Sequence, residues 1–237
     1  MPYRIDKRIE MIDWSHIEKS LHDNGFGVLP AILDNDQCNE IITMYGKESY
    51  FRTTINMERY RFGKGEYKYF NAPLPTIIEQ LRIGLYPELA KIANSWLVKM
   101  GSHGSYPLTL DEFLNHCHQH DQIRSTPLIL KYEEGGYNCL HQDLYGDVFF
   151  PFQVVFVLNK REIDYEGGEF LLIEQRPRAQ SKGQVITLVQ GAGLIFPTNN
   201  RPTEGKKGYY KATIKHGVST ITAGTRYSLG IIFHDAK

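Results

Sequence analysis

The sequence has few cysteines, no excess of charge and no long apolar run, and each of these features excludes a class of protein. Its three cysteines, Cys38, Cys117 and Cys139, are too few and too scattered for a disulfide framework or a thiolate zinc site. We therefore expect three small core residues in a reducing compartment. Lysine plus arginine equals aspartate plus glutamate at 27 each, so no global field favours nucleic acid or a membrane surface.

The chain also has no sequence signature of membrane insertion. Its first residues, MPYRIDKRIEMIDW, are charged and contain no apolar signal-peptide core, and no run approaches the roughly 18 apolar residues of a membrane span. We expect a soluble cytoplasmic protein without a membrane partner. The 237 residues, 41% of them hydrophobic, suit one domain or one domain with a helical extension, and composition leaves the oligomeric state open.

The region 1–125 has the periodicity of helices. Two stretches with apolar residues at helical spacing, 77–85 and 88–100, are separated by Pro87, which we expect to break the helix. Together with the capping signals, the pattern predicts a support region of four or five helices. Three residue pairs match the capping-box pattern: Ser15 with Glu18, Asp34 with Gln37, and Thr109 with Glu112.

From residue 126 onward the pattern changes to short β-rich runs separated by turn residues. The turns EGG at 166–168 and GAG at 191–193 supply the positive-φ positions that hairpins require. We predict an α+β fold, in which a double-stranded β-helix (a jelly-roll or cupin-like barrel) over 126–237 follows the helical layer. The runs are PLILKY, FQVVFVLN, EFLLIE, QVITLV, GLIFP, YKATIKHGV and RYSLGIIF.

A histidine and an aspartate lie two residues apart in YNCLHQDLYGD. Residues i and i+2 of a strand share one face, so His141 and Asp143 can converge on a metal ion, with Asp147 as the alternative carboxylate. His216, 75 positions after His141 on a late strand, is the candidate third ligand. Two imidazoles and one carboxylate leave three positions of an octahedral ion open, as in non-haem Fe(II) oxygenases, although a hydrolytic zinc uses similar ligands.

An arginine follows the third candidate ligand by ten residues. Arg226 and Ser228 share a strand face, so a guanidinium fork and a hydroxyl can bind one carboxylate near the metal. A co-substrate that chelates iron through a keto acid and carries a second carboxylate fits this pair, and 2-oxoglutarate is such a molecule. A structural ion pair is the alternative for Arg226.

On these residues the region from Pro127 to Asp235 resembles the Fe(II)/2-oxoglutarate-dependent oxygenases. The LN, GGEF, HGV and GxRY elements are similar to prolyl-4-hydroxylase-type members, and YxxGxxxxLHQD is similar to AlkB-type nucleic-acid dealkylases. The whole chain, with GKGEYKYF at 63–70, also resembles a bacterial family named for oxidative treatment of damaged DNA. The matched elements are Tyr132, Gly135, H-x-D at 141–143, Leu158 with Asn159, GGEF at 167–170, GxGLIF at 191–196, HGV at 216–218 and GxRYSL at 224–229.

The resemblance implies a reaction and its cofactors. It implies that His141, Asp143 and His216 bind Fe(II), that Arg226 and Ser228 bind 2-oxoglutarate, and that O2 is consumed with release of succinate and CO2. Ascorbate is expected to support such activity. Three further residues are candidates for co-substrate or product contact: Tyr132, whose alternative is aromatic packing, and Asn138 and Gln153, whose alternative is a buried amide that satisfies backbone groups.

The substrate is less constrained than the reaction. The sequence has Ile232 where the AlkB type has a second arginine, and Leu130 where it has an asparagine two residues before the tyrosine. These departures and the neutral net charge favour hydroxylation of a small molecule, an amino acid or a peptide residue. The family resemblance favours oxidative dealkylation of alkylated DNA or RNA bases. A cupin-like barrel that binds a metal or ligand without turnover is the alternative that is not an enzyme.

Three other segments contain residue types that occur at functional sites. Segment 50–70 has seven aromatic and five basic residues, which suit a lid over the barrel mouth, contact with nucleic acid or plain packing. Segment 198–210, TNNRPTEGKKGYY, suits an active-site loop. NHCHQHD at 115–121 and FHD at 233–235 contain further histidines, for which a helix end and a strand end are the expected explanations.

Overall fold

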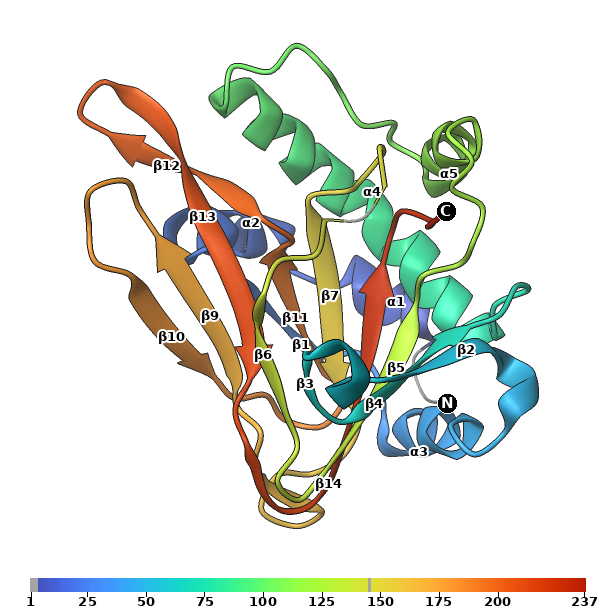
Figure 1. Ribbon diagram of the computed structural model, residues 1–237. Helices are drawn as coiled ribbons and strands as arrows, with labels where there is room; N and C mark the ends of the chain where they lie inside the picture. The colour runs from blue at the N-terminus through green and yellow to red at the C-terminus, as the bar shows by residue number, and fades with distance from the viewer. Residues whose placement is uncertain (1–3, 145) are drawn as a thin grey trace.

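The computed structural model describes residues 4–144 and 146–237 and consists of two β-sheets with helices on one side (Figure 1). The helices are α1 (Ile5–Glu10), α2 (Trp14–Asn24), α3 (Asn35–Met44), α4 (Thr76–Lys99) and α5 (Leu110–His118), with short 3-10 turns η1 (Glu48–Tyr50) and η2 (Glu58–Tyr60). The strands are β1 (Gly27–Ala31), β2 (Phe51–Asn56), β3 (Gly63–Lys64), β4 (Glu66–Phe70), β5 (Leu128–Glu133), β6 (Tyr137–His141), β7 (Phe152–Val157), β8 (Tyr165–Gly167), β9 (Phe170–Gln175), β10 (Lys182–Ile186), β11 (Ala192–Pro197), β12 (Asn200–Gly205), β13 (Gly208–Val218) and β14 (Ile221–Ile232).

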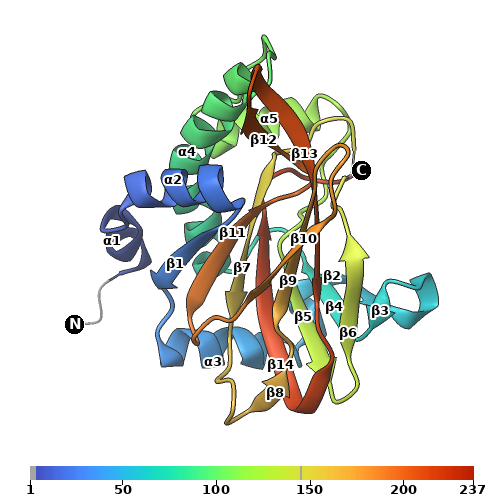
Figure 2. The ribbon, with the colours of Figure 1, turned by 90° about the vertical axis from the view of Figure 1, so that its left-hand side faces the viewer.

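The two sheets form a jelly roll. The larger has eight strands in the order β1-β11-β7-β14-β5-β4-β2, with β8 paired to β14, and the smaller has six in the order β10-β9-β13-β6-β3, with β12 paired to β13. The strand pairs within both sheets are antiparallel. Figure 2 shows the two sheets side by side, with α1, α2 and α4 beyond the larger one. The predicted double-stranded β-helix with a helical layer is confirmed.

The larger sheet separates two apolar clusters, one under the helices and one inside the barrel, because side chains alternate along each strand. On β14, Leu229 and Ile231 pack in the cluster under the helices, whereas Arg226 and Ser228 point to the other face. On β7, Val154 and Phe156 face the helices, and Val155 and Val157 face the barrel interior. The alternation therefore places the polar residues of β14 inside the barrel.

Strands in the first half of the chain were not predicted. The β1 strand joins the edge of the larger sheet, and β2 to β4 add to both sheets, so residues before and after position 125 share each sheet. Segment 50–70 therefore consists mainly of paired strands. Its run EYKYF has the alternation of a strand, but its short length and many polar residues gave a weak signal.

Two helix predictions were wrong in detail. The capping box at Asp34 and Gln37 is confirmed, and Thr109 caps α5, but α2 is capped by Asp13 rather than Ser15. Helix α4 also continues through Pro87, which was expected to break it. Proline removes a hydrogen bond to the carbonyl four residues earlier. That residue, Ile83, is 49% exposed, so water can satisfy its carbonyl while the opposite helix face stays packed.

Other expectations also differ from the structure. Segment 198–210 is not an open loop: it contains β12 and the turn to β13, and Arg201 and Thr203 within it are buried. Cys38 and Cys117 are core residues as expected, but Cys139 on β6 is exposed. Within the described ranges, no helix is both long and apolar enough to span a membrane.

Candidate metal centre and co-substrate pocket

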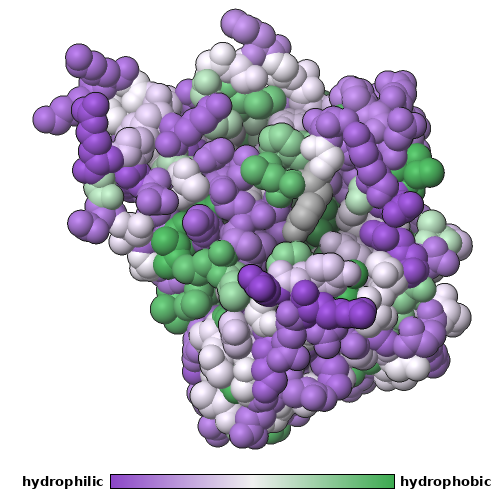
Figure 3. All heavy atoms as spheres, in the orientation of Figure 1, coloured by the Kyte–Doolittle hydropathy of each residue, from purple (hydrophilic) through white to green (hydrophobic). Residues whose placement is uncertain are grey.

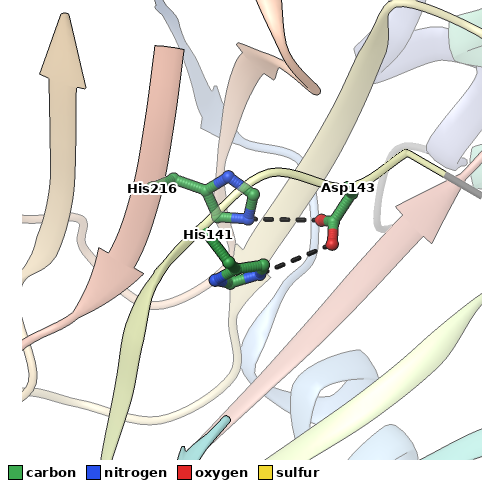
Figure 4. Close-up of side chains that lie close together, drawn as sticks. All are labelled: His141, Asp143 and His216. Carbon is green, nitrogen blue, oxygen red and sulfur yellow. Dashed lines mark ion pairs between the residues drawn. The ribbon is translucent and has the colours of Figure 1, made fainter.

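Two strands of the smaller sheet bring the predicted histidines together. His216 on β13 is the direct cross-strand partner of His141 at the end of β6, and their ring centroids are 4.2 Å apart. Asp143 follows β6, where its backbone N–H donates to the carbonyl of Thr198 at 3.1 Å. Its carboxylate oxygens lie 3.4 Å from Nε2 of His141 and 3.2 Å from Nε2 of His216 (Figure 4).

The three side chains present a ligand set of the kind that metal ions require. One ligand atom from each lies within 4.8 Å of the others, and among the described residues this is the only such group of histidine, cysteine and acidic side chains. Nδ1 of His141 donates to the carbonyl oxygen of Cys139 at 2.7 Å, so the lone pair of that ring is on Nε2, which faces Asp143. The tautomer therefore suits metal ligation.

The local electrostatics favour the protonation states that metal ligands need. Burial raises the pKa of Asp143, but the hydrogen bond from His216 and the charges of both histidines outweigh it and hold the pKa well below its usual range. Burial, with the neighbouring His216, lowers the pKa of His141. At neutral pH the aspartate is therefore ionised and His141 is neutral, and a metal ion binds these forms.

Gln153 belongs to the same cluster. This buried residue on β7 donates from Nε2 to Oδ2 of Asp143 at 2.7 Å, and the same atom lies 3.3 Å from Nε2 of His216. Its amide thus contacts two of the candidate metal ligands. The predicted contact between Gln153 and the co-substrate or product stays a prediction, since Gln153 also lines the cavity.

The guanidinium group of Arg226 lies on the neighbouring β14 strand and faces the same cavity. Arg226 is 2% exposed, and its Nη1 donates to the hydroxyl of Ser228 at 3.1 Å. Its Cζ atom lies 5.9 Å from the ring centroid of Tyr132, which is its cross-strand partner on β5. In the part of the chain that is described, no carboxylate forms an ion pair with Arg226, and its Nε atom has no hydrogen-bond partner. A buried cation without an anion is costly, so this site is suited to an anionic ligand.

One cavity of about 430 Å³ contains all of these groups. Its walls include every predicted site residue: His141, Asp143, His216, Arg226, Ser228, Tyr132, Asn138 and Gln153. Exposed lining residues, among them Arg61, Phe62 and Leu140, mark the mouth. Hydrophobic and hydrophilic residues are mixed on the face of the molecule in Figure 3, and the hydrophobic residues form no single continuous surface there.

Sequence reasoning missed part of the cavity wall. Tyr67 and Tyr69 of β4 face the cavity because β4 extends the sheet beside Leu128 and Leu130. We had assigned both tyrosines only to a lid-like segment, and the alternation within EYKYF was the available signal. Five residues of segment 50–70 line the cavity: Met57, Arg61, Phe62, Tyr67 and Tyr69.

The other histidines lie elsewhere. His118 at the end of α5 contacts Asp235 at 3.1 Å, and Asp235 also accepts from Arg82 at 2.8 Å. His234 is buried, and its Nδ1 accepts from the backbone of Phe150 at 3.2 Å. None of these residues lines the cavity, so the structural explanations expected for both segments agree with the contacts.

The donor set fits a non-haem iron and an acidic co-substrate. Two imidazoles and one carboxylate can hold Fe(II) with positions left open. Arg226, which forms no ion pair with the residues that the structure describes, can hold a carboxylate beside Ser228 in the same cavity. Together with the jelly roll, this arrangement defines the class of 2-oxoglutarate- and Fe(II)-dependent oxygenases.

Comparison with known families gives the assignment within that class. Residues 65–236 match the model of Oxygenase-NA, described as an oxygenase catalysing oxidative methylation of damaged DNA. The chain belongs to this family. It is 50% identical over 167 residues to uncharacterized protein MT2286 of Mycobacterium tuberculosis strain CDC 1551, which covers 70% of this chain and 72% of the relative. The same values hold for uncharacterized protein Rv2227 of strain H37Rv.

Solved structures share the fold at low sequence identity. A prolyl-4-hydroxylase of Pseudomonas putida has a TM-score of 0.56 and 13% identity, covering 94% of this chain and 99% of its own. A prolyl hydroxylase of Trichoplax adhaerens, in complex with a hypoxia inducible factor peptide fragment, has a TM-score of 0.56 and 17% identity, covering 99% of this chain and 94% of its own. A 2OG-Fe(II) oxygenase family protein of Burkholderia pseudomallei has a TM-score of 0.56 and 14% identity, covering 95% of this chain and 93% of its own. These matches place the fold among such oxygenases.

Proposed function

We propose that this oxygenase hydroxylates a C–H bond of a substrate that enters the cavity, with 2-oxoglutarate and O2 as co-substrates. The balanced reaction converts substrate C–H, 2-oxoglutarate and O2 into substrate C–OH, succinate and CO2. His141, Asp143 and His216 would hold the Fe(II), which supplies O2 activation when bound. The protein's own residues orient the co-substrate and exclude water from the inner cavity.

The observation that carries this proposal is the buried Arg226, which has no ion pair with any described residue and lies in the same cavity as the three candidate ligands. A structural zinc site or a zinc hydrolase leaves this arginine unexplained. The guanidinium fork and the hydroxyl of Ser228 supply donors for the carboxylate of 2-oxoglutarate that is remote from the metal. Tyr132 and Asn138 also line this cavity, and we propose that they contact the co-substrate or product.

The preferred substrate is a small molecule, an amino acid or a peptide residue. A cavity of about 430 Å³ that must also hold the co-substrate leaves room for a group of side-chain size. Apolar residues dominate the wall, among them Leu128, Leu130 and Ile232, and the last stands where a dealkylase has a second arginine. Of segment 50–70, the exposed Arg61 and Phe62 lie at the mouth, and this part is proposed to act as its lid.

Oxidative dealkylation of a nucleic-acid base is the second candidate, and the exposed aromatic residues at the mouth favour it. Tyr60 and Phe62 stack with centroids 5.6 Å apart, and they are 54% and 44% exposed. Within the described ranges, the neighbouring Arg59, Arg61 and Lys64 form no ion pair, so they can contact phosphates. Stacking surfaces beside cations suit single-stranded or flipped bases, and hydroxylation of an N-methyl group would release formaldehyde.

The test is succinate formation by the purified protein with Fe(II), ascorbate and 2-oxoglutarate under air. We expect slow turnover alone and faster turnover with one class from a panel of amino acids, peptides and methylated oligonucleotides. The H216A variant is the matched control, and it should form no succinate. Absence of succinate from an iron-loaded wild-type protein under every condition would contradict the proposal and favour a binding barrel.

The Y60A/F62A variant separates the two substrate classes. If the substrate is a nucleic acid, this variant should lose stimulation by the oligonucleotide but retain its slow turnover without substrate. If the substrate is a small molecule bound inside the cavity, loss of the exposed stack should change its half-saturating concentration little. Variant T54A, on the exposed part of the same segment, controls for nonspecific effects.

A further inference from the structure

The position of Arg226 in β14 coincides with a gap in the hydrogen-bond ladder. On one side β14 pairs with β5 through residues 225–230. On the other side the pairing with β7 begins at Ser228, and the pairing with β8 ends at Gly224. On that edge the N–H of Thr225 donates to the carbonyl of Asp164 at 3.1 Å, and the carbonyl of Tyr227 accepts from the N–H of Leu158 at 3.1 Å. The carbonyl of Thr225 and the N–H of Tyr227, which lie between these two bonds, have no backbone partner among the described residues.

The side chain of Asn159 fills this gap. Its Nδ2 donates to the carbonyl oxygen of Thr225 at 3.0 Å, and its Oδ1 accepts from the backbone N–H of Tyr227 at 2.7 Å. One buried amide thus bonds the residue before and the residue after Arg226, as the peptide group of a neighbouring strand would. These two bonds fix the backbone from which the arginine side chain extends.

A glycine supports the side chain itself. Gly168 has a φ of +64°, and a Cβ atom built on it would lie 2.9 Å from Cδ of Arg226 and 2.4 Å from Cδ1 of Ile221. The arginine's methylene groups therefore occupy the space that any other residue at position 168 would need. A larger residue at this position would push the guanidinium from its present direction.

We propose that Asn159 and Gly168 are positioning residues that act on the co-substrate through Arg226. The guanidinium of Arg226 lies near the rings of Tyr132 and Tyr165, with Cζ 5.9 and 6.0 Å from their centroids, but it has one neutral hydrogen-bond partner and no ion pair among the described residues. The strand clamp and the glycine contact add to these ring contacts in fixing its direction. A guanidinium held in advance of binding loses less conformational entropy when a carboxylate arrives.

The inference rests on the proposed use of 2-oxoglutarate, and direct binding tests it without turnover. We would titrate 2-oxoglutarate into the Mn(II)-loaded protein by calorimetry, measure Mn(II) affinity by electron paramagnetic resonance, and record thermal unfolding. For N159A and G168A we expect the Kd of 2-oxoglutarate to rise about tenfold, while Mn(II) affinity stays within about twofold of wild type.

The matched control is Q122A. Gln122 is also buried, and its side chain also bonds backbone groups, with Nε2 donating to the carbonyl of Val148 at 2.8 Å and Oε1 accepting from the N–H groups of Asp147 and Val148. It lies outside the cavity lining. This variant should unfold at a lower temperature but keep the wild-type Kd for 2-oxoglutarate. N159D, which retains the acceptor and loses the donor, replaces N159A if that variant does not fold.

A double substitution separates positioning from general damage. In the R226A background, N159A should weaken 2-oxoglutarate binding no further, because the residue through which it acts is gone. An equal further loss, a parallel loss of Mn(II) affinity, or wild-type binding by both N159A and G168A would each overturn the inference. Failure of the wild-type protein to bind 2-oxoglutarate would instead contradict the proposed function.

Discussion

Nε2 of Gln153 donates a 2.7 Å hydrogen bond to Oδ2 of Asp143, and it lies 3.3 Å from Nε2 of His216. All three residues are buried, so the amide restricts the orientation of the carboxylate. Groups that hold a metal ligand in place usually affect metal affinity as well as geometry. We therefore infer a role for Gln153 in orienting the candidate ligand.

Substitution of Gln153 should weaken metal binding more than co-substrate binding. For Q153A we expect the affinity for Fe(II), or for Mn(II) as its probe, to fall about 10-fold to 100-fold, because Asp143 loses the hydrogen bond from the Gln153 amide. The control is Q190A, because Gln190 donates to the backbone carbonyl of Leu158 and not to a ligand. If metal affinity is unchanged and 2-oxoglutarate affinity is weaker, Gln153 contacts the co-substrate, as the sequence predicts, rather than orienting Asp143.

The structure distinguishes the two aspartates that follow the first histidine. Asp143 lies against both imidazoles, whereas Asp147 is exposed and pairs with Lys237 at 2.7 Å. We expect D143A to lose most of its iron affinity and turnover, and D147A to keep both. Metal titration with a turnover assay on the two variants checks this. Intact iron binding by D143A together with its loss in D147A would move the ligand to Asp147.

Replacement of Arg226 should raise the requirement for 2-oxoglutarate. Loss of a charge-assisted contact worth roughly 1.5–3 kcal/mol predicts an increase of one to two orders of magnitude in the half-saturating concentration for R226A. R226K keeps a positive charge but loses the planar fork, so its increase should be smaller. If both variants require the same concentration as wild type, the carboxylate binds at another place in the cavity.

Local spacing was sufficient to predict much of the site but not its surroundings. The i, i+2 relationship of Arg226 and Ser228 depends only on strand geometry, and the register of β6 and β13 places His216 opposite His141. The H-x-D spacing predicted the right pair, although Asp143 lies just beyond the end of β6 rather than on the strand. The bonds from Asn159 to Thr225 and Tyr227 span more than 60 residues of chain, so no local pattern reveals them. Sequence similarity marked Asn159 without indicating what it contacts.

The helical layer illustrates the same limit. The capping box at Asp34 is a contact within four residues, and the sequence predicted it correctly. The continuation of α4 through Pro87 depends on packing against the sheet, which outweighs the local preference of proline. The strands β3 and β4 are stabilised by pairing with β6 and β5, far along the chain, and β2 pairs with β4, so their short polar sequences indicate little on their own.

A buried ion pair away from the cavity gives a prediction for stability against pH. Glu174 on β9 is 2% exposed and accepts from Nε of Arg201 at 2.6 Å and from Arg176. Burial raises the pKa of Glu174, but the hydrogen bond from Arg176 and the charge of Arg201 outweigh it, and the pKa is lowered. The ionised carboxylate therefore stabilises the fold above the ordinary carboxyl pKa range. That contribution is lost as the pH falls through the lowered folded-state pKa.

Thermal unfolding of wild type and E174Q between pH 7 and pH 3 measures this contribution. At pH 7 we expect E174Q to be less stable by about 3–5 kcal/mol, because Arg201 remains buried without its anion. The difference between the two proteins should shrink towards pH 3, since protonation removes the same charge from wild type. E133Q is the control, because Glu133 pairs with Lys131 at the surface, where solvent screens the interaction. A constant difference between wild type and E174Q at every pH would show that lost packing, and not lost charge, destabilises the variant.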